Sequence, residues 1–75
     1  GMLYQLRKAF NESRNIEIMY LGGKGEVSQR VIRILEINEH TVKAYCYYKK
    51  AVRLFKIESM LSGRIVMPYK KRKGA

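Results

Sequence analysis

The order of hydrophobic and polar positions divides the chain into one helical segment followed by extended segments. In residues 2–13, Leu3, Leu6 and Phe10 recur at spacings of three and four, with charged residues between them. This spacing predicts a short amphipathic helix. The period changes to two in residues 15–21, "NIEIMYL", and this alternation predicts a strand.

Turn residues separate the segments that follow. "GGKGE" at residues 22–26 predicts a hairpin turn, because glycine readily adopts the positive φ angles that such turns need. Residues 27–37, "VSQRVIRILEI", have apolar side chains at even and odd positions, so we expect a long strand that bends or bulges and changes which side faces the core. The turn residues "NEH" precede a strand expected at residues 41–48, and "KKA" separates it from a strand expected at 52–57. After a break at "ESMLSG", a last strand is expected at residues 64–67.

One helix followed by five short strands is typical of a small, strongly bent sheet that closes into a barrel and hides most of its edges. We therefore predict a mainly β fold, in which a short N-terminal helix precedes a five-stranded small barrel. Seventy-five residues suffice for one such domain, and neither a linker nor an internal repeat interrupts it. We place the domain at residues 1–67.

The chain is strongly basic. Sixteen Lys and Arg residues against six Glu and no Asp give a formal net charge of +10. Part of this excess lies in residues 68–75, where we expect a flexible basic tail that carries Lys70, Lys71, Arg72 and Lys73. Clustered Lys and Arg attract phosphates, and binding releases condensed counterions. We therefore expect an anionic partner, which could be nucleic acid, a nucleotide-like anion or an anionic membrane surface.

The residue types that catalysis or metal binding needs are scarce. Strand parity places Cys46 with Val42 and Ala44, which favours a buried thiol over a nucleophile. His40, the only histidine, would lie about 20 Å from Cys46 along an extended strand, too far to act as its base. One Cys and one His supply half of the ligands of a zinc site, and the six Glu are scattered. We expect no enzyme, with no catalytic residue, no metal and no cofactor.

The same cysteine count bears on location. A single cysteine cannot form an internal disulfide, and the sequence contains neither a signal peptide nor an apolar run long enough to span a membrane. We therefore expect a cytoplasmic protein with no membrane span.

The other face of the same predicted strand mixes flat rings with cations. Lys43, Tyr45 and Tyr47 share this face with Lys49. Exposed tyrosine rings can stack on nucleic-acid bases while neighbouring lysines hold the phosphates. Alternatively, the tyrosines pack under the helix or at a dimer contact, and the lysines only keep a strand edge in water.

The next predicted strand adds an arginine beside apolar positions. Arg53 shares a face with Phe55 and Ile57, and its planar guanidinium could hold a carboxylate or phosphate in bidentate fashion. The alternative is a partly buried ion pair with a glutamate. Arg30 allows the same two interpretations. Tyr20 could offer its hydroxyl to the same site or fill the core.

Several of these segments together resemble a WYL domain, a bacterial module with a small SH3-like (Sm-like) barrel. The resemblance covers about residues 3–67 and is carried by "IMY" with Tyr20, the glycine-containing turn, "RVIRI" with Arg30, "VKAYC", and above all "RLFKIE" at residues 53–58. It implies a regulatory or sensor domain that binds nucleic-acid-derived or other anionic ligands through a basic and aromatic surface. In longer relatives a DNA-binding winged helix is attached, and residues 2–14 have room for only one helix.

From the residues and this resemblance we expect a non-catalytic regulatory or sensor domain in transcription regulation. It would bind single-stranded nucleic acid or a nucleotide-like anion, with Tyr20, Arg30, Lys43, Tyr45, Tyr47, Arg53 and Phe55 as the candidate binding residues. The alternative is a protein-interaction or oligomerisation module, which would assemble through strand edges or the helix with itself or with a separate transcription regulator.

Overall fold

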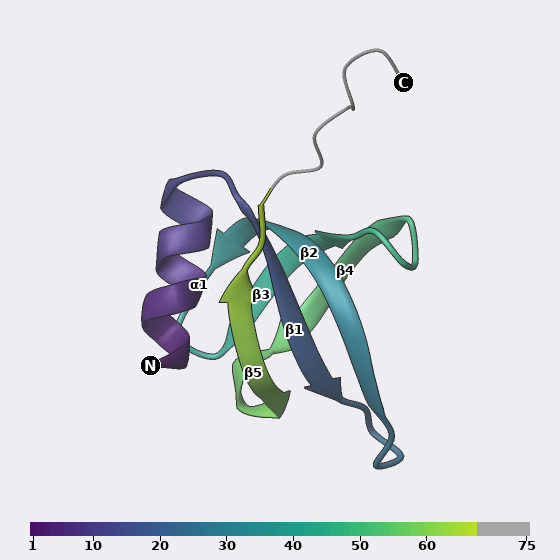
Figure 1. The fold of residues 1–75 in the computed structure, drawn as a ribbon. Helices are drawn as coiled ribbons and strands as arrows, with labels where there is room; N and C mark the ends of the chain where they lie inside the picture. Colours follow the sequence, from purple (N-terminus) through teal and green to yellow (C-terminus); the bar gives the residue numbers. More distant parts are fainter. Residues whose placement is uncertain (68–75) are drawn as a thin grey trace.

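A computed structural model describes residues 1–67, which form one helix and five antiparallel strands (Figure 1). The bounds are α1 Met2–Asn11, β1 Asn15–Leu21, β2 Val27–Ile37, β3 Thr41–Cys46, β4 Ala51–Lys56, the 3-10 helix η1 Ile57–Ser59, and β5 Met60–Ile65. The predicted mainly β fold with an N-terminal helix is confirmed. The basic tail predicted at residues 68–75 lies outside the described residues.

The strands form a single bent sheet in the order β4-β3-β2-β1-β5, so β4 and β5 are its edges. Figure 1 shows α1 lying against the sheet beside β5. No strand ladder joins β4 to β5 within residues 1–67, and the sheet is open there. Its curl nevertheless brings β1 to β4, because the Lys56 amide donates to the Tyr20 hydroxyl at 2.9 Å. The Tyr20 and Phe55 rings also meet edge to face, with centroids 5.0 Å apart.

A bulge in β2 changes which side chains face the core, as the mixed apolar pattern predicts. Ile32 and Ile34 pair with β3 on the buried side, and the register then shifts between Ile34 and Glu36. The shift leaves Leu35 exposed and turns Ile37 toward the core against which it packs. One strand therefore contributes inward-facing side chains on both sides of its bend.

The core lies between α1 and the inner face of the sheet. Its buried members are Leu6, Ala9, Ile16, Ile18, Ile32, Ile34, Val42, Ala44, Cys46, Phe55 and Met60. The face of α1 that meets the sheet differs from the predicted one, since Leu3 and Phe10 are exposed whereas Met2, Leu6 and Ala9 pack inward. These three positions lie on one side of a helix, and the small Ala9 side chain allows a close approach to the sheet.

Three strands differ in their bounds from the predicted ones, and β4 is shifted by only one residue. β3 ends at Cys46 rather than at Tyr48, because residues 47–50 form the turn, with Lys50 at φ 56° and its amide donating to the Cys46 carbonyl at 2.7 Å. β5 begins at Met60, although the sequence around it resembles a break. Its central Gly63 faces α1, and a Cβ there would lie 3.0 Å from the Met2 sulfur, so a larger residue would make the Met2 side chain shift.

Truncating the centre of the core tests this arrangement. Ile32 is fully buried and pairs with Ile16 on β1 and with Cys46 on β3. We expect Ile32→Ala to lower the free energy of unfolding by about 3 kcal/mol, a large share of the roughly 5 kcal/mol available to a domain of this size. In urea denaturation, Leu54→Ala is the matched control, because Leu54 is 66% exposed. Equal losses in the two variants would contradict the core described here.

Candidate anion-binding site on the β3–β4 hairpin

The charged side chains of the β3–β4 hairpin are all positive. This hairpin consists of β3, the turn at residues 47–50, and β4. Residues 41–57 contain five Lys or Arg side chains and no glutamate. The ion pairs among the described residues, Arg14 with Glu12, His40 with Glu39 and Arg64 with Glu17, involve none of these five cations. Their positive charge is therefore available to an external anion.

Arg30 lies beside this hairpin with only neutral partners. Its Nε donates to the Ser28 hydroxyl at 3.1 Å, and its Nη1 donates to the Cys46 sulfur at 3.6 Å. The guanidinium carbon also lies 5.2 Å from the centre of the Tyr48 ring, a cation–π distance. Within residues 1–67 no carboxylate forms an ion pair with Arg30. The half-buried guanidinium is thus held in place while its charge is not neutralised.

Arg53 lies at the rim of the inner face. Its partner in the register is the buried Ala44, yet its own side chain is exposed and donates from Nη1 to the Val52 carbonyl at 3.2 Å. It forms no ion pair with a glutamate of the described chain. The neighbouring Phe55 is only 4% exposed and packs on Tyr20, so its ring belongs to the core.

Tyr20 has a structural position. Its half-buried ring packs on Phe55, and its hydroxyl accepts the hydrogen bond from the Lys56 amide. This contact fixes the end of β1 against the end of β4. Tyr20 would therefore affect a ligand at the hairpin indirectly, by holding β4 in place, rather than by direct contact through its hydroxyl.

Three predicted residues lie on the outer face of the sheet, away from the core. Lys43 is exposed, Tyr45 is half-buried, and Tyr47 is 43% exposed. The two tyrosine rings meet edge to face, with centroids 5.1 Å apart. They do not pack under α1, which covers the opposite, inner face of the sheet.

Sequence reasoning missed the residues that orient this outer cluster. The Asn15 side-chain oxygen accepts from the Tyr47 hydroxyl at 3.2 Å and from Arg33 Nε at 3.1 Å. Arg33 pairs directly with Tyr45 across β2 and β3. The alternation of β2 could have placed Arg33 outside, but only the register between the strands places it beside the tyrosines.

The turn at residues 47–50 is where the inner and outer groups meet. Tyr48 is 73% exposed, although its parity within the predicted strand is that of the buried Cys46, and Lys49 Nζ lies 5.5 Å from the centre of its ring. Tyr47 contacts Asn15 on the outer face, whereas Tyr48 contacts Arg30 on the inner one. The candidate residues therefore form two groups on opposite faces, joined by consecutive tyrosines at the turn.

Cys46 is fully buried beneath this turn, as strand parity predicts. Burial raises the pKa of its thiol. Hydrogen bonds from the Lys49 amide, the Arg30 side chain and the Tyr48 amide, together with the charge of Arg30, lower it, and the net result is a pKa below the ordinary value. The sulfur thus helps to hold Arg30 in place. These polar contacts could not be predicted from the apolar residues beside Cys46 in β3.

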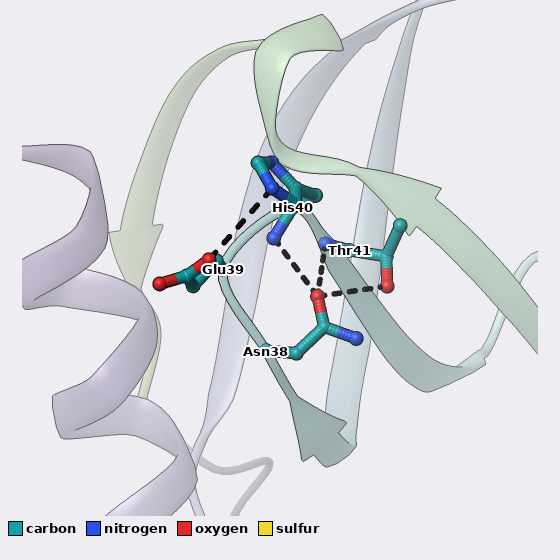
Figure 2. Close-up of polar contacts among 4 residues, drawn as sticks. All are labelled: Asn38, Glu39, His40 and Thr41. Atoms are coloured by element: carbon teal, nitrogen blue, oxygen red, sulfur yellow. Dashed lines mark hydrogen bonds and ion pairs between the residues drawn. The ribbon is translucent and has the colours of Figure 1, made fainter.

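A hollow of about 460 Å³ lies at the other end of the hairpin, lined by Glu39, His40, Thr41, Lys56, Ile57 and Glu58. Figure 2 shows the turn beside it, where the Asn38 side-chain oxygen accepts from the His40 and Thr41 amides, each at 2.8 Å, and from the Thr41 hydroxyl at 3.2 Å. Two glutamates in the lining make this hollow less suited to an anion than the lysine-rich turn.

The described residues contain no cluster of three or more His, Cys, Asp or Glu side chains that could hold a metal ion. In the same part of the chain, the helices are too short to cross a membrane.

The fold is similar to part of a solved structure, Proteasome accessory factor B/C (PafBC) of Arthrobacter aurescens. The match has a TM-score of 0.76 and 24% sequence identity, and covers 84% of this chain but 11% of that chain. This chain therefore spans a small part of that protein's length. The likeness concerns the fold and is consistent with the WYL-like domain expected from the sequence. No protein-family model matches the chain, and no curated protein matches it.

The contact between Arg30 and Cys46 predicts a measurable change in titration. In Arg30→Gln the thiol loses a charged hydrogen-bond donor, so the pKa of Cys46 should rise. Ultraviolet absorbance of the thiolate across a pH series measures this pKa. Arg33→Gln is the matched control, because its guanidinium lies on the outer face. A Cys46 pKa that is equally affected by the two substitutions would contradict the contact.

The same substitution has a consequence for stability, because a pKa that is lower in the folded state than in the unfolded state links folding to pH. The parent protein gains stability as the pH rises from the folded-state pKa of Cys46 toward the unfolded-state pKa, and loses this contribution as the pH falls. Arg30→Gln should reduce this alkaline gain, which urea denaturation at several pH values would detect.

The hydrogen bond between Tyr20 and β4 predicts a modest structural role. Tyr20→Phe keeps the ring on Phe55 but removes the acceptor of the Lys56 amide, so we expect a loss of about 1 kcal/mol in the free energy of unfolding. Tyr4→Phe is the control, because Tyr4 is 63% exposed on α1. Unchanged stability in Tyr20→Phe, measured by thermal or urea unfolding, would show that this contact does not fasten β1 to β4.

Proposed function

We propose that this chain is a non-catalytic regulatory domain that binds single-stranded nucleic acid, or a nucleotide-like anion, at the β3–β4 hairpin. The observation that carries the proposal is the position of Arg30. Its guanidinium is half-buried, fixed by Ser28 and Cys46, and set against the exposed Tyr48 ring without a carboxylate partner. A guanidinium with this setting suits a phosphate group.

The aromatic side chains favour a nucleic acid with unpaired bases. Tyr47 and Tyr48 present exposed rings on the two sides of one turn, and Lys49 and Lys50 lie beside them in the same turn. Stacking of a base on such a ring contributes roughly 1–3 kcal/mol, and the cations hold the backbone phosphates. A single strand that crosses the turn could use both groups, with Lys43 and Arg33 on the outer side.

A regulatory role is the interpretation that agrees with the resemblance to WYL domains. The similarity to PafBC supports the fold, and the chain spans only 11% of that protein. We infer that the domain acts on transcription through an attached or separate regulator, with the anionic ligand as its signal. The arrangement offers no nucleophile and base within reach of one another in residues 1–67, so catalysis is not part of the proposal.

The test is fluorescence anisotropy with short labelled single-stranded oligonucleotides over a salt series, using the full chain. We expect Tyr48→Ala to weaken binding about tenfold, which corresponds to one stacked base. We expect Arg53→Ala to lower the magnitude of the slope of log K against log salt by roughly 0.7, the value for one phosphate contact on a single strand.

The controls separate this site from general attraction to a basic chain. Tyr4→Ala removes an exposed ring from α1, and Lys24→Ala removes one charge from the β1–β2 turn. Both should bind as the parent protein does. Deletion of residues 68–75 should weaken binding of every oligonucleotide while leaving the effect of Tyr48→Ala intact. If Tyr48→Ala and Arg53→Ala behave like these controls, the hairpin is not the binding site.

A further inference from the structure

The free edge of β4 is accessible over most of its length. Four of its six residues, Val52, Arg53, Leu54 and Lys56, are exposed. Leu54, at 66%, is the most exposed large hydrophobic side chain of any described strand. The register of β4 with β3 runs through six consecutive pairs without a bulge, and β4 contains no proline. Bulges and prolines are two of the usual means of blocking a strand edge, and this edge has neither; the charged side chains that it carries, Arg53 and Lys56, are the block that remains.

The hydrogen-bond pattern shows which backbone groups of β4 point outward. The Ile57 amide donates to the His40 carbonyl on the β3 side, whereas the Lys56 amide points away from β3 to the Tyr20 hydroxyl. Because successive amides of a strand point in opposite directions, the amides and carbonyls of Val52 and Leu54 also point away from β3. These groups match the spacing that an added antiparallel strand requires.

Arg53 bears on the same edge, because its guanidinium donates to the Val52 carbonyl. This contact occupies one outward acceptor in the free protein. The side chain is exposed, so it can leave that carbonyl for a carboxylate on an incoming strand, to which it would form a stronger, charge-assisted hydrogen bond. In the free protein, Arg53 thus covers one acceptor of the edge, and an acidic partner would draw its side chain away.

We propose that the β4 edge binds an acidic extended peptide segment, in which apolar and acidic residues alternate, as an added strand. Charge decides the occupant. Residues 41–57 carry five cations and no carboxylate, so a second copy of β4 would bring like charges together across the new pairs. Carboxylates on one face of the incoming strand would meet Arg53, while apolar side chains on its other face would cover Val52 and Leu54. This proposal is independent of nucleic-acid binding.

Amide hydrogen exchange followed by NMR on the full chain tests the proposal residue by residue. The probe is a short, acetylated and amidated synthetic peptide in which valine and glutamate alternate. We expect it to slow exchange at the Val52 and Leu54 amides, which face outward. The Arg53 and Phe55 amides, which face β3, should be protected with or without the peptide.

Two further peptides and two variants sharpen the test. A peptide with alternate amides N-methylated keeps the charge but loses backbone donors, and a peptide with lysine for glutamate keeps the backbone but reverses the charge. Both should bind at least tenfold more weakly. Leu54→Glu should weaken the Val–Glu peptide roughly fivefold, because it places a carboxylate against the apolar side chains that would cover Leu54 and lowers the positive charge of the hairpin. Leu61→Glu, on the opposite edge strand, is the matched control and should not.

Three results would overturn the proposal. Equal binding of the N-methylated peptide would show attraction without strand addition. Protection of Val52 and Leu54 that depends on protein concentration alone would show that a second copy occupies the edge. Equal protection of these two amides by a single-stranded oligonucleotide would assign the surface to nucleic acid.

Discussion

The bulge at Leu35 is the constraint on which the rest of the fold depends. A regular strand alternates sides at every residue, so Ile34 and Ile37 could not both face the core without one residue outside the register. The extra residue bends β2, and the bend lets five strands curve around a single small core. Residues 1–67 bury only eleven hydrophobic side chains, so a core of this size loses much of its stability if one isoleucine is left in water.

The parts of the fold that could be predicted are those fixed by local sequence. β1 and β2 begin and end where alternation and the glycine turn place them, and the bulge follows from apolar residues at both parities. β5 could be found only in part, because the strand predicted at residues 64–67 overlaps its last two residues while its first four read as a break. Its Gly63 resembles a strand breaker in the sequence, and the side chain of Met2, from the other end of the chain, lies against it. The inward face of α1 likewise depends on the sheet that it meets.

The candidate site shows the same division. Parity within β3 predicts that Cys46 lies inside and that Lys43 and Tyr45 lie outside, because alternation is a property of one strand. The contacts of Arg30 with Tyr48 and of Asn15 with Tyr47 depend on pairing between distant segments. These contacts cannot be predicted from the sequence as long as the pairing of its strands is unknown. For this reason residues expected in one site are divided between two faces.

The contact between Tyr20 and Lys56 makes the hairpin asymmetric. Its β4 end is fastened to β1, thirty-six residues away along the chain, while its turn end projects beyond the ladder with exposed side chains. The turn end is held by other contacts: the Tyr47 amide donates to the Val31 carbonyl, the Tyr47 hydroxyl donates to Asn15, and Cys46 is buried beneath the turn. Because separate contacts hold the two ends, a molecule that displaces the exposed side chains of the turn would leave Phe55 and its part of the core in place.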